Sequence, residues 1–193
     1  MSLGHDQWLF LSEFLRHPLQ VAAVQPSSRA FVDDLLDDFS FDPDRVYVEY
    51  GAGTGVVAKE ICRRMSEDSV CVAVEPNRSF GDYLWHENSR IKVIQDRAEN
   101  ATDKILELYG PADLIIAGLP FSMMSEENIH SVIDSAHTLL RGDGELRMFL
   151  YAHSLVLPKI QKMMDYSLER FPLTWTNLSW NNIPPMAIIR CLQ

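Results

Sequence analysis

Short apolar runs alternate with amphipathic segments along most of this chain. Five runs of strand length are rich in β-branched and other apolar residues, at positions 46–50, 70–74, 91–94, 113–117 and 145–151. Near-continuous apolar runs are typical of parallel strands whose two faces are both covered. The pattern therefore predicts an α/β fold in which helices lie on both faces of a mostly parallel sheet.

The segments between these runs carry helical periodicity. Helices are predicted at residues 54–65, 79–87, 126–140 and 158–169, and the third has the clearest spacing of apolar positions. We expect Gly142-Asp143-Gly144 to end that third helix with a left-handed turn. Residues 173–180 and 186–191 then predict two closing strands, with Pro184 and Pro185 in the connection. The expected sheet has seven strands and a C-terminal antiparallel hairpin.

Two further helices, at residues 6–17 and 27–39, precede the alternating pattern. Ser27 or Ser28 is a suitable N-cap for the second of them. We therefore expect an N-terminal helical extension over residues 1–40, followed by one domain over residues 41–193. The chain contains no internal repeat and no low-complexity segment.

The composition narrows the class of protein. Hydrophobic residues make up 47% of the chain, and no stretch approaches the roughly 20 apolar residues of a membrane span. The first residues do not resemble a secretory signal, so a cytoplasmic location is expected. Three cysteines, Cys62, Cys71 and Cys191, are interpreted as buried apolar residues. The net charge of −10 disfavours nucleic acid as a partner.

A glycine-rich segment follows the first predicted strand. Glu49-Tyr50-Gly51-Ala52-Gly53-Thr54-Gly55 runs directly into a predicted helix. Glycines allow a tight bend and a close approach of ligand to backbone, and the helix N-terminus favours an anion such as a carboxylate. Glu75-Pro76 ends the second strand, where an acid can accept both hydroxyls of a ribose. These residues predict a site for an adenosine-containing cofactor.

Two cofactors compete for this site. Residues 53–58 fit the GxGxxA pattern of dinucleotide-binding proteins, which is a weak signal by itself. Glu49 lies at the strand end, where its carboxylate would repel a pyrophosphate. The same acid would help to hold the cationic methionine end of S-adenosylmethionine. The pattern therefore favours methyl transfer, since a glycine turn without a ligand leaves the two acids unexplained.

The motifs resemble those of class I S-adenosylmethionine-dependent methyltransferases, in the glycine segment, in Val74-Glu75-Pro76-Asn77 and in Gly118-Leu119-Pro120-Phe121. Within that class, four segments are similar to the bacterial phospholipid N-methyltransferases, which methylate phosphatidylethanolamine: residues 14–18, 26–30, 118–121 and 180–186. That family in turn resembles the ribosomal RNA adenine dimethyltransferases. The resemblance spans nearly the whole chain and implies a Rossmann-like methyltransferase fold.

Two positions depart from the family pattern. After the third strand the family usually shows Gly-Asp-Ala, whose acid faces the adenine amino group, whereas this chain has Asp96-Arg97-Ala98. Arg97 thus stands at the place of the acid, and Asp96 reaches the adenine only with a one-residue shift. Ala117 replaces the serine or asparagine that often precedes Gly118. That side chain is therefore not available to contact an acceptor.

The acceptor site is predicted at Gly118, Leu119, Pro120 and Phe121, and Gly118 is also counted among the cofactor contacts. This segment follows the fourth strand, at the carboxyl edge where open α/β sheets bind ligands. Carbonyl groups there would hold an amine, and the ring of Phe121 would face a developing ammonium, unless it packs in the core. His153 is the histidine to test as a proton acceptor. The sequence shows neither a nucleophilic triad nor a set of metal ligands.

Residues 7–18 predict a short amphipathic helix with Trp8, Phe10, Leu11, Phe14 and Leu15 on one arc. This pattern suits peripheral contact with a membrane and equally suits packing against the sheet. Three functions remain open. The favoured one is methylation of an amine, on phosphatidylethanolamine or a similar amphiphile. The alternatives are an RNA adenine N-methyltransferase and a non-catalytic S-adenosylmethionine-binding scaffold.

Overall fold

The computed structural model describes residues 28–193 and contains one seven-stranded sheet. The strands are β1 (Val46–Tyr50), β2 (Val70–Val74), β3 (Ile91–Ile94), β4 (Ala112–Ala117), β5 (Leu140–Tyr151), β6 (Leu173–Ser179) and β7 (Met186–Leu192). Their order across the sheet is β3-β2-β1-β4-β5-β7-β6. Strands β1 to β5 are parallel to one another, and β7 is antiparallel to both β5 and β6. The predicted α/β sheet with its closing hairpin is confirmed.

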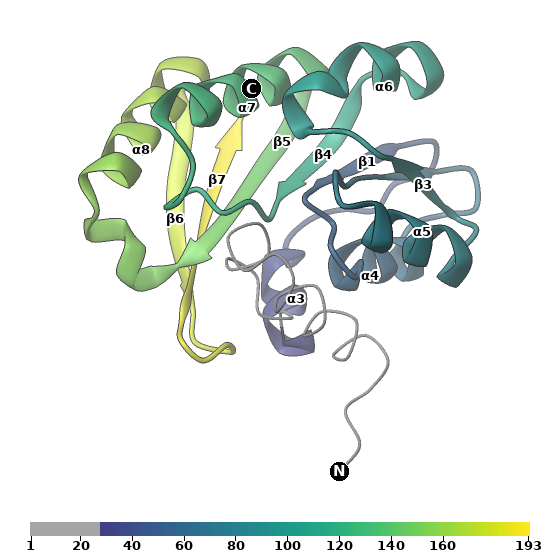
Figure 1. Ribbon diagram of the computed structural model, residues 1–193, viewed down its shortest axis with the longest axis horizontal. Coiled ribbons are helices and arrows are strands. Elements are labelled where there is room, and N and C mark those ends of the chain that lie inside the picture. The colour runs from purple at the N-terminus through teal and green to yellow at the C-terminus, as the bar shows by residue number, and fades with distance from the viewer. Residues whose placement is uncertain (1–27) are drawn as a thin grey trace.

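Helices cover both faces of this sheet (Figure 1). One face packs against α6 (Thr102–Tyr109), α7 (Glu126–Leu139) and α8 (Pro158–Arg170), through buried side chains such as Ile105, Ile133 and Met163. The other face packs against α3 (Arg29–Leu35), α4 (Val56–Arg64) and α5 (Arg78–Glu87), through buried side chains such as Phe31, Ile61 and Leu84. Short 3₁₀ helices, η1 (Ala98–Asn100) and η2 (Ala152–Val156), follow β3 and β5.

Helix α3 belongs to this packed unit. Ser28 is its N-cap, since the Ser28 hydroxyl accepts a hydrogen bond from the Phe31 N–H at 3.1 Å. At its other end, the buried Arg147 of β5 donates to the carbonyls of Leu35 and Asp37 at 2.7 and 2.8 Å. Arg147 thereby satisfies carbonyls that the end of a helix leaves unpaired. The predicted helix at residues 6–17 lies outside the described residues.

The prediction for Gly142-Asp143-Gly144 is wrong. Helix α7 ends at Leu139, and Leu140 leads directly into β5 with extended backbone. Neither Gly142 nor Gly144 has a positive φ. Leu140 pairs with Ala112 and the next pairing joins Leu114 to Glu145, so the residues between form a bulge on β5. The buried Leu140 side chain and its pairing to β4 decide this backbone, in place of the glycines.

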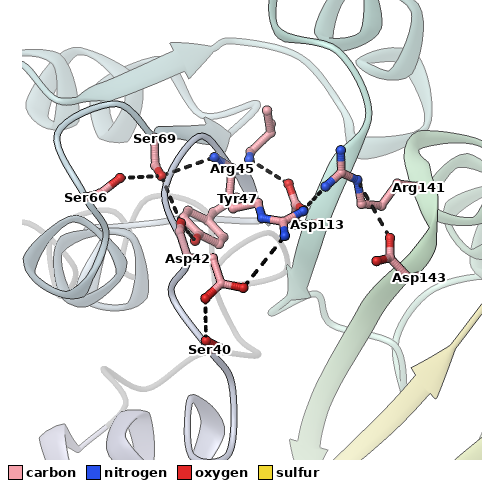
Figure 2. A network of polar contacts seen from close by, with 10 residues as sticks. Ser40, Asp42, Arg45, Tyr47, Ser66, Ser69, Asp113, Arg141 and Asp143 are labelled. Carbon is pink, nitrogen blue, oxygen red and sulfur yellow. Dashed lines mark hydrogen bonds and ion pairs between the residues drawn. The ribbon is translucent and has the colours of Figure 1, made fainter.

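A polar network occupies the amino edge of the sheet (Figure 2). Asp113 accepts hydrogen bonds from the Val46 N–H at 2.8 Å and from the guanidinium groups of Arg45 and Arg141 at 2.8 and 2.7 Å. The Arg45 N–H donates to the Ser69 hydroxyl at 3.2 Å. These bonds join the beginnings of β1, β2 and β4 to the bulge of β5. The polar groups at this edge therefore stabilise the fold.

Candidate functional site

The predicted strand, glycine bend and helix are present in that order. Gly51 follows β1, and its N–H donates to the Val74 carbonyl of β2 at 2.9 Å. The Gly55 N–H donates to the Ala52 carbonyl at 2.7 Å, which closes the bend just before α4 begins at Val56. Gly53 and Gly55 have φ of +53° and +73°, which is the left-handed region that favours glycine.

Gly51 also has a positive φ, of +77°, but Gly53 and Gly55 are the pair whose surroundings differ most. A Cβ atom at Gly55 would lie 2.2 Å from Cδ2 of the buried Leu84, so α5 requires glycine there. A Cβ atom at Gly53 would meet nothing within 4 Å. The backbone at Gly53 therefore faces open space, which is what a ligand needs for close approach.

Glu75 lies beside this open backbone, at the carboxyl end of β2. One carboxylate oxygen accepts from the Gly53 N–H and the other from the Asn77 N–H, both at 2.8 Å. Burial raises the pKa of Glu75 in spite of these two bonds. Pro76, which follows it, is exposed. Glu75 thus fixes the bend and keeps a carboxylate at the strand end.

Glu49 lies on β1 and is also buried. Its carboxylate accepts from the Ala58 N–H at 2.8 Å and so caps the first turn of α4, for which Gly55 has no side chain. Burial raises the pKa of Glu49 well above its usual range, and the nearby Glu75 carboxylate raises it further. Two buried acids therefore flank the bend, and a cation bound there would favour their ionised form.

The side chain of Tyr50 does not reach the bend. Successive residues of a strand point to opposite faces, so Tyr50 points toward α7. Its hydroxyl is 3.2 Å from that of Ser135, and burial raises its pKa to about 12. Its backbone does contribute, because the Tyr50 carbonyl accepts from the Gly118 N–H at 3.0 Å.

The three cofactor contacts predicted after β3, Asp96, Arg97 and Ala98, have different surroundings. Asp96 is exposed, and one of its oxygens accepts from the Asn100 side chain at 3.1 Å and from the Arg97 N–H at 2.7 Å. These two bonds lower the pKa of Asp96. Arg97 forms an ion pair with Glu99, and Ala98 is buried at the start of η1. Asp96 is thus ionised and retains a second carboxylate oxygen, whereas the Arg97 guanidinium is already paired.

Gly118 begins the loop after β4. A Cβ atom there would lie 2.6 Å from the ring of Phe149, so β5 approaches this backbone closely. The Leu119 carbonyl accepts from the Phe121 N–H, and the Pro120 carbonyl accepts from the Met123 N–H, both at 2.8 Å. Among the described residues no donor reaches the Gly118 carbonyl. Of these three carbonyls, that of Gly118 is therefore the candidate to bind an amine.

A pocket opens between this loop and the carboxyl end of β5. All four predicted residues of the loop line it, together with Met123, Phe149, Tyr151, His153, Ser154 and Met186. Phe121 is only 1% exposed and packs in the core as well as forming part of the pocket wall. The rings of Tyr151 and His153 stack with 5.6 Å between their centroids. The sequence pointed to His153 but gave no local signal for Phe149 or Tyr151.

Hydrogen bonds join the first described residues to the β6–β7 turn. Ser28 donates through its N–H to the Asn182 side chain at 3.3 Å and through its hydroxyl to the Asn181 carbonyl at 2.5 Å. The Asn181 side chain donates to Asp34 of α3 at 2.9 Å. These contacts join parts of two segments that carry the family resemblance, residues 26–30 and 180–186.

Two features are absent from residues 28–193. No group of three or more His, Cys, Asp or Glu side chains is placed to hold a metal ion. No helix in this range is long and apolar enough to cross a membrane. Residues 7–18, predicted to make peripheral membrane contact, lie outside the described part of the chain. The three cysteines are free and buried, as predicted.

The sheet order, the glycine bend after β1 and the antiparallel β7 define a Rossmann-like methyltransferase fold. An O-methyltransferase from Bacillus cereus in complex with SAH shares it, with a TM-score of 0.68 and 15% identity over 100% of this chain and 93% of that one. Fibrillarin from Aeropyrum pernix with bound S-adenosyl-L-methionine gives a TM-score of 0.60, with 15% identity over 84% of this chain and 72% of that one.

One curated protein is similar in sequence. An ornithine lipid N-methyltransferase from Singulisphaera acidiphila is 29% identical over 127 residues, which cover 63% of this chain and 66% of that protein. The match thus spans just under two thirds of the relative. No family model matches the chain.

Proposed function

We propose that this protein binds S-adenosylmethionine at the glycine bend and transfers its methyl group to an amine in the adjoining pocket. The observation that carries the proposal is the arrangement at the carboxyl edge of β1 and β2. There the open backbone of Gly53 lies between the buried carboxylates of Glu49 and Glu75. Open α/β sheets bind ligands at this edge, and the fold is that of methyltransferases.

The residues present fit this cofactor. The α-ammonium and sulfonium of S-adenosylmethionine are cationic, which matches two acids whose pKa values burial has raised. Its carboxylate would accept from N–H groups at the start of α4. Glu75 would accept the ribose hydroxyls. Asp96 has an ionised carboxylate and would accept from the adenine amino group. It would thus do the work of the acid that the family has at the position of Arg97.

When bound, the cofactor supplies an electrophilic methyl group on a positively charged sulfur. The protein's own residues then position the acceptor, and positioning lowers such barriers by several kcal/mol, roughly 7–11 at most. The Gly118 carbonyl would accept a hydrogen bond from the amine. The aromatic rings of Phe121 and Tyr151 would face the charge that develops on nitrogen. His153 would take the proton that the amine must lose.

For the acceptor, we propose an amine-bearing amphiphile such as phosphatidylethanolamine or an ornithine lipid. The similarity to an ornithine lipid N-methyltransferase supports an amine on a lipid. The pocket lining supports it too, because apolar side chains such as Phe149 and Met186 accompany the polar Ser154 and His153. Among residues 28–193, the lining contains no acid to pair with a large polycationic acceptor and no Lys or Arg to hold a nucleic-acid backbone.

The test has two stages. Calorimetry with S-adenosylmethionine, S-adenosylhomocysteine and NAD should show binding of the first two and none of the third. Labelled cofactor with phosphatidylethanolamine, ornithine lipid and ribosomal RNA should then label a lipid. Failure of the folded protein to bind either nucleoside at millimolar concentration refutes the proposal. Labelling of RNA favours the RNA adenine methyltransferase, and binding without transfer favours the non-catalytic scaffold.

A further inference from the structure

Large apolar side chains are exposed on three turns at the carboxyl edge of the sheet. The most exposed are Ile183 at 89%, Val156 at 81% and Trp180 at 74%. Met123 and Leu157 are also exposed, at 46% and 40%. We call these five residues the apolar rim. They belong to the loop after β4, to η2 and its end, and to the β6–β7 turn.

The three turns lie next to one another around the pocket mouth. The Ala152 N–H of η2 donates to the Pro185 carbonyl of the β6–β7 turn at 2.9 Å. The Lys159 ammonium, at the start of α8, donates to the Met124 carbonyl of the loop after β4 at 2.8 Å. Each turn also supplies or borders a pocket residue, namely Met123, Ser154 and Met186. The three turns that carry the rim therefore border the proposed acceptor site.

Charge is absent from the rim. Residues 118–124, 152–157 and 180–185 contain no Asp, Glu, Lys or Arg, although these types make up 23% of the chain. Of the charged groups that border the rim, Asp34 accepts from Asn181 at 2.9 Å, and Glu126 pairs with Lys162 at 2.9 Å. On a chain with a net charge of −10, these three turns thus form an apolar surface without Asp, Glu, Lys or Arg of its own. They would meet less repulsion from an anionic or neutral lipid surface than the acidic faces of the chain would.

We propose that the apolar rim inserts into the interface of a lipid bilayer and places the pocket mouth against the headgroups. Trp180 suits this depth because an indole places an apolar body and a polar N–H at the boundary between hydrocarbon and water. Ile183 and Val156 add apolar area, on which interfacial binding depends. This docking deepens the proposed function and rests on it. Its structural basis lies entirely in described residues and does not involve residues 7–18.

The experiment compares the full-length protein with Trp180→Ser/Ile183→Ser and with Trp85→Ser as a matched control. Trp85 is 66% exposed on α5, outside the three turns. Co-sedimentation with phosphatidylcholine vesicles should show at least tenfold weaker binding for the double variant and unchanged binding for Trp85→Ser. Circular dichroism melts confirm that each variant is folded. Equal vesicle binding by the double variant and the natural protein overturns the proposal.

Two other occupants of the rim give distinct results. If a second copy of the chain covers it, sedimentation equilibrium will show the double variant to be monomeric where the natural protein is dimeric, with vesicle binding unchanged. If residues 1–27 cover it, vesicle binding will also be unchanged while the melting temperature of the double variant falls. Either result overturns membrane docking.

A soluble substrate separates this proposal from the proposed function. Methyl transfer to a short-chain ethanolamine lipid below its critical micelle concentration should be the same for all three proteins. Transfer to the same headgroup in vesicles should fall only in the double variant. Vesicle binding through the rim without any methyl transfer refutes the proposed function and leaves docking standing. Full activity of the double variant on vesicles refutes docking and leaves the function standing.

Discussion

Gly53 and Gly55 form a matched pair in which one structural difference decides the effect of the same substitution. Both have left-handed backbone, so alanine at either position costs about 1–2 kcal/mol in conformational strain. At Gly55 the new Cβ would also lie 2.2 Å from Cδ2 of Leu84, a side chain with 0% exposure. Such overpacking costs a further amount of about 1–3 kcal/mol. We therefore expect Gly55→Ala to be destabilised by about 2–5 kcal/mol and Gly53→Ala by about 1–2 kcal/mol.

Urea unfolding of both variants, followed by circular dichroism at pH 7, measures this difference. Calorimetry on the same samples measures the affinity for S-adenosylmethionine, and here we expect Gly53→Ala to be the more severely affected variant. Because Gly53 faces open space, its alanine variant fills the proposed cofactor site and should bind S-adenosylmethionine at least tenfold more weakly. Equal free energies of unfolding for the two variants would refute the tight contact between the bend and α5. Unchanged cofactor affinity in Gly53→Ala would refute the placement of the cofactor.

Three further predictions concern single side chains. Asp113→Ala should lower the free energy of unfolding by about 1–3 kcal/mol, since it leaves the Val46 N–H and two arginines without their acceptor, while cofactor affinity stays unchanged by calorimetry. Glu49→Gln should weaken cofactor binding by about tenfold or more at high pH, and this loss should shrink on acidification. The natural protein loses stability as pH increases, because the pKa of Glu49 is raised in the folded state. In urea unfolding, the stability of Glu49→Gln relative to the natural protein should therefore rise with pH. His153→Asn should lower kcat/KM for the amine by about 100-fold, with cofactor affinity and the melting temperature unchanged; activity equal to that of the natural protein excludes it as the proton acceptor.

The strands and the bend could be predicted because their signals are local. The predicted bounds of β1, β2 and β3 coincide with those observed, since each is a short and mainly apolar run that ends at a glycine or a polar residue. The glycine spacing likewise placed the bend. Helix α6 was not predicted, because it has only eight residues, of which Thr102 and Ile105 alone are buried.

The contacts that complete the site could not be predicted, because they join residues far apart in the sequence. Ser28 and Asn182 are separated by 154 positions, and nothing local marks them as partners. Arg147 lies within a run that reads as an apolar strand, yet its guanidinium is buried against Glu145 at 2.8 Å and against the end of α3. Only the assembled sheet brings these groups together.

The two edges of the sheet differ in how their polar groups are used. At the amino edge, the acid Asp113 accepts three hydrogen bonds and leaves its neighbours paired. At the carboxyl edge, the Gly118 carbonyl meets no described donor, and Glu49 and Glu75 are held buried against the preference of a carboxylate for water. The hydrogen bonds that Glu49 and Glu75 accept offset only part of the cost of their burial, since their pKa values stay raised, whereas a bound cation would favour the ionised acids and a bound amine would donate to Gly118. Substitution of these polar groups at the carboxyl edge should therefore change chemistry more than stability, whereas substitution of Asp113 at the amino edge should change stability alone.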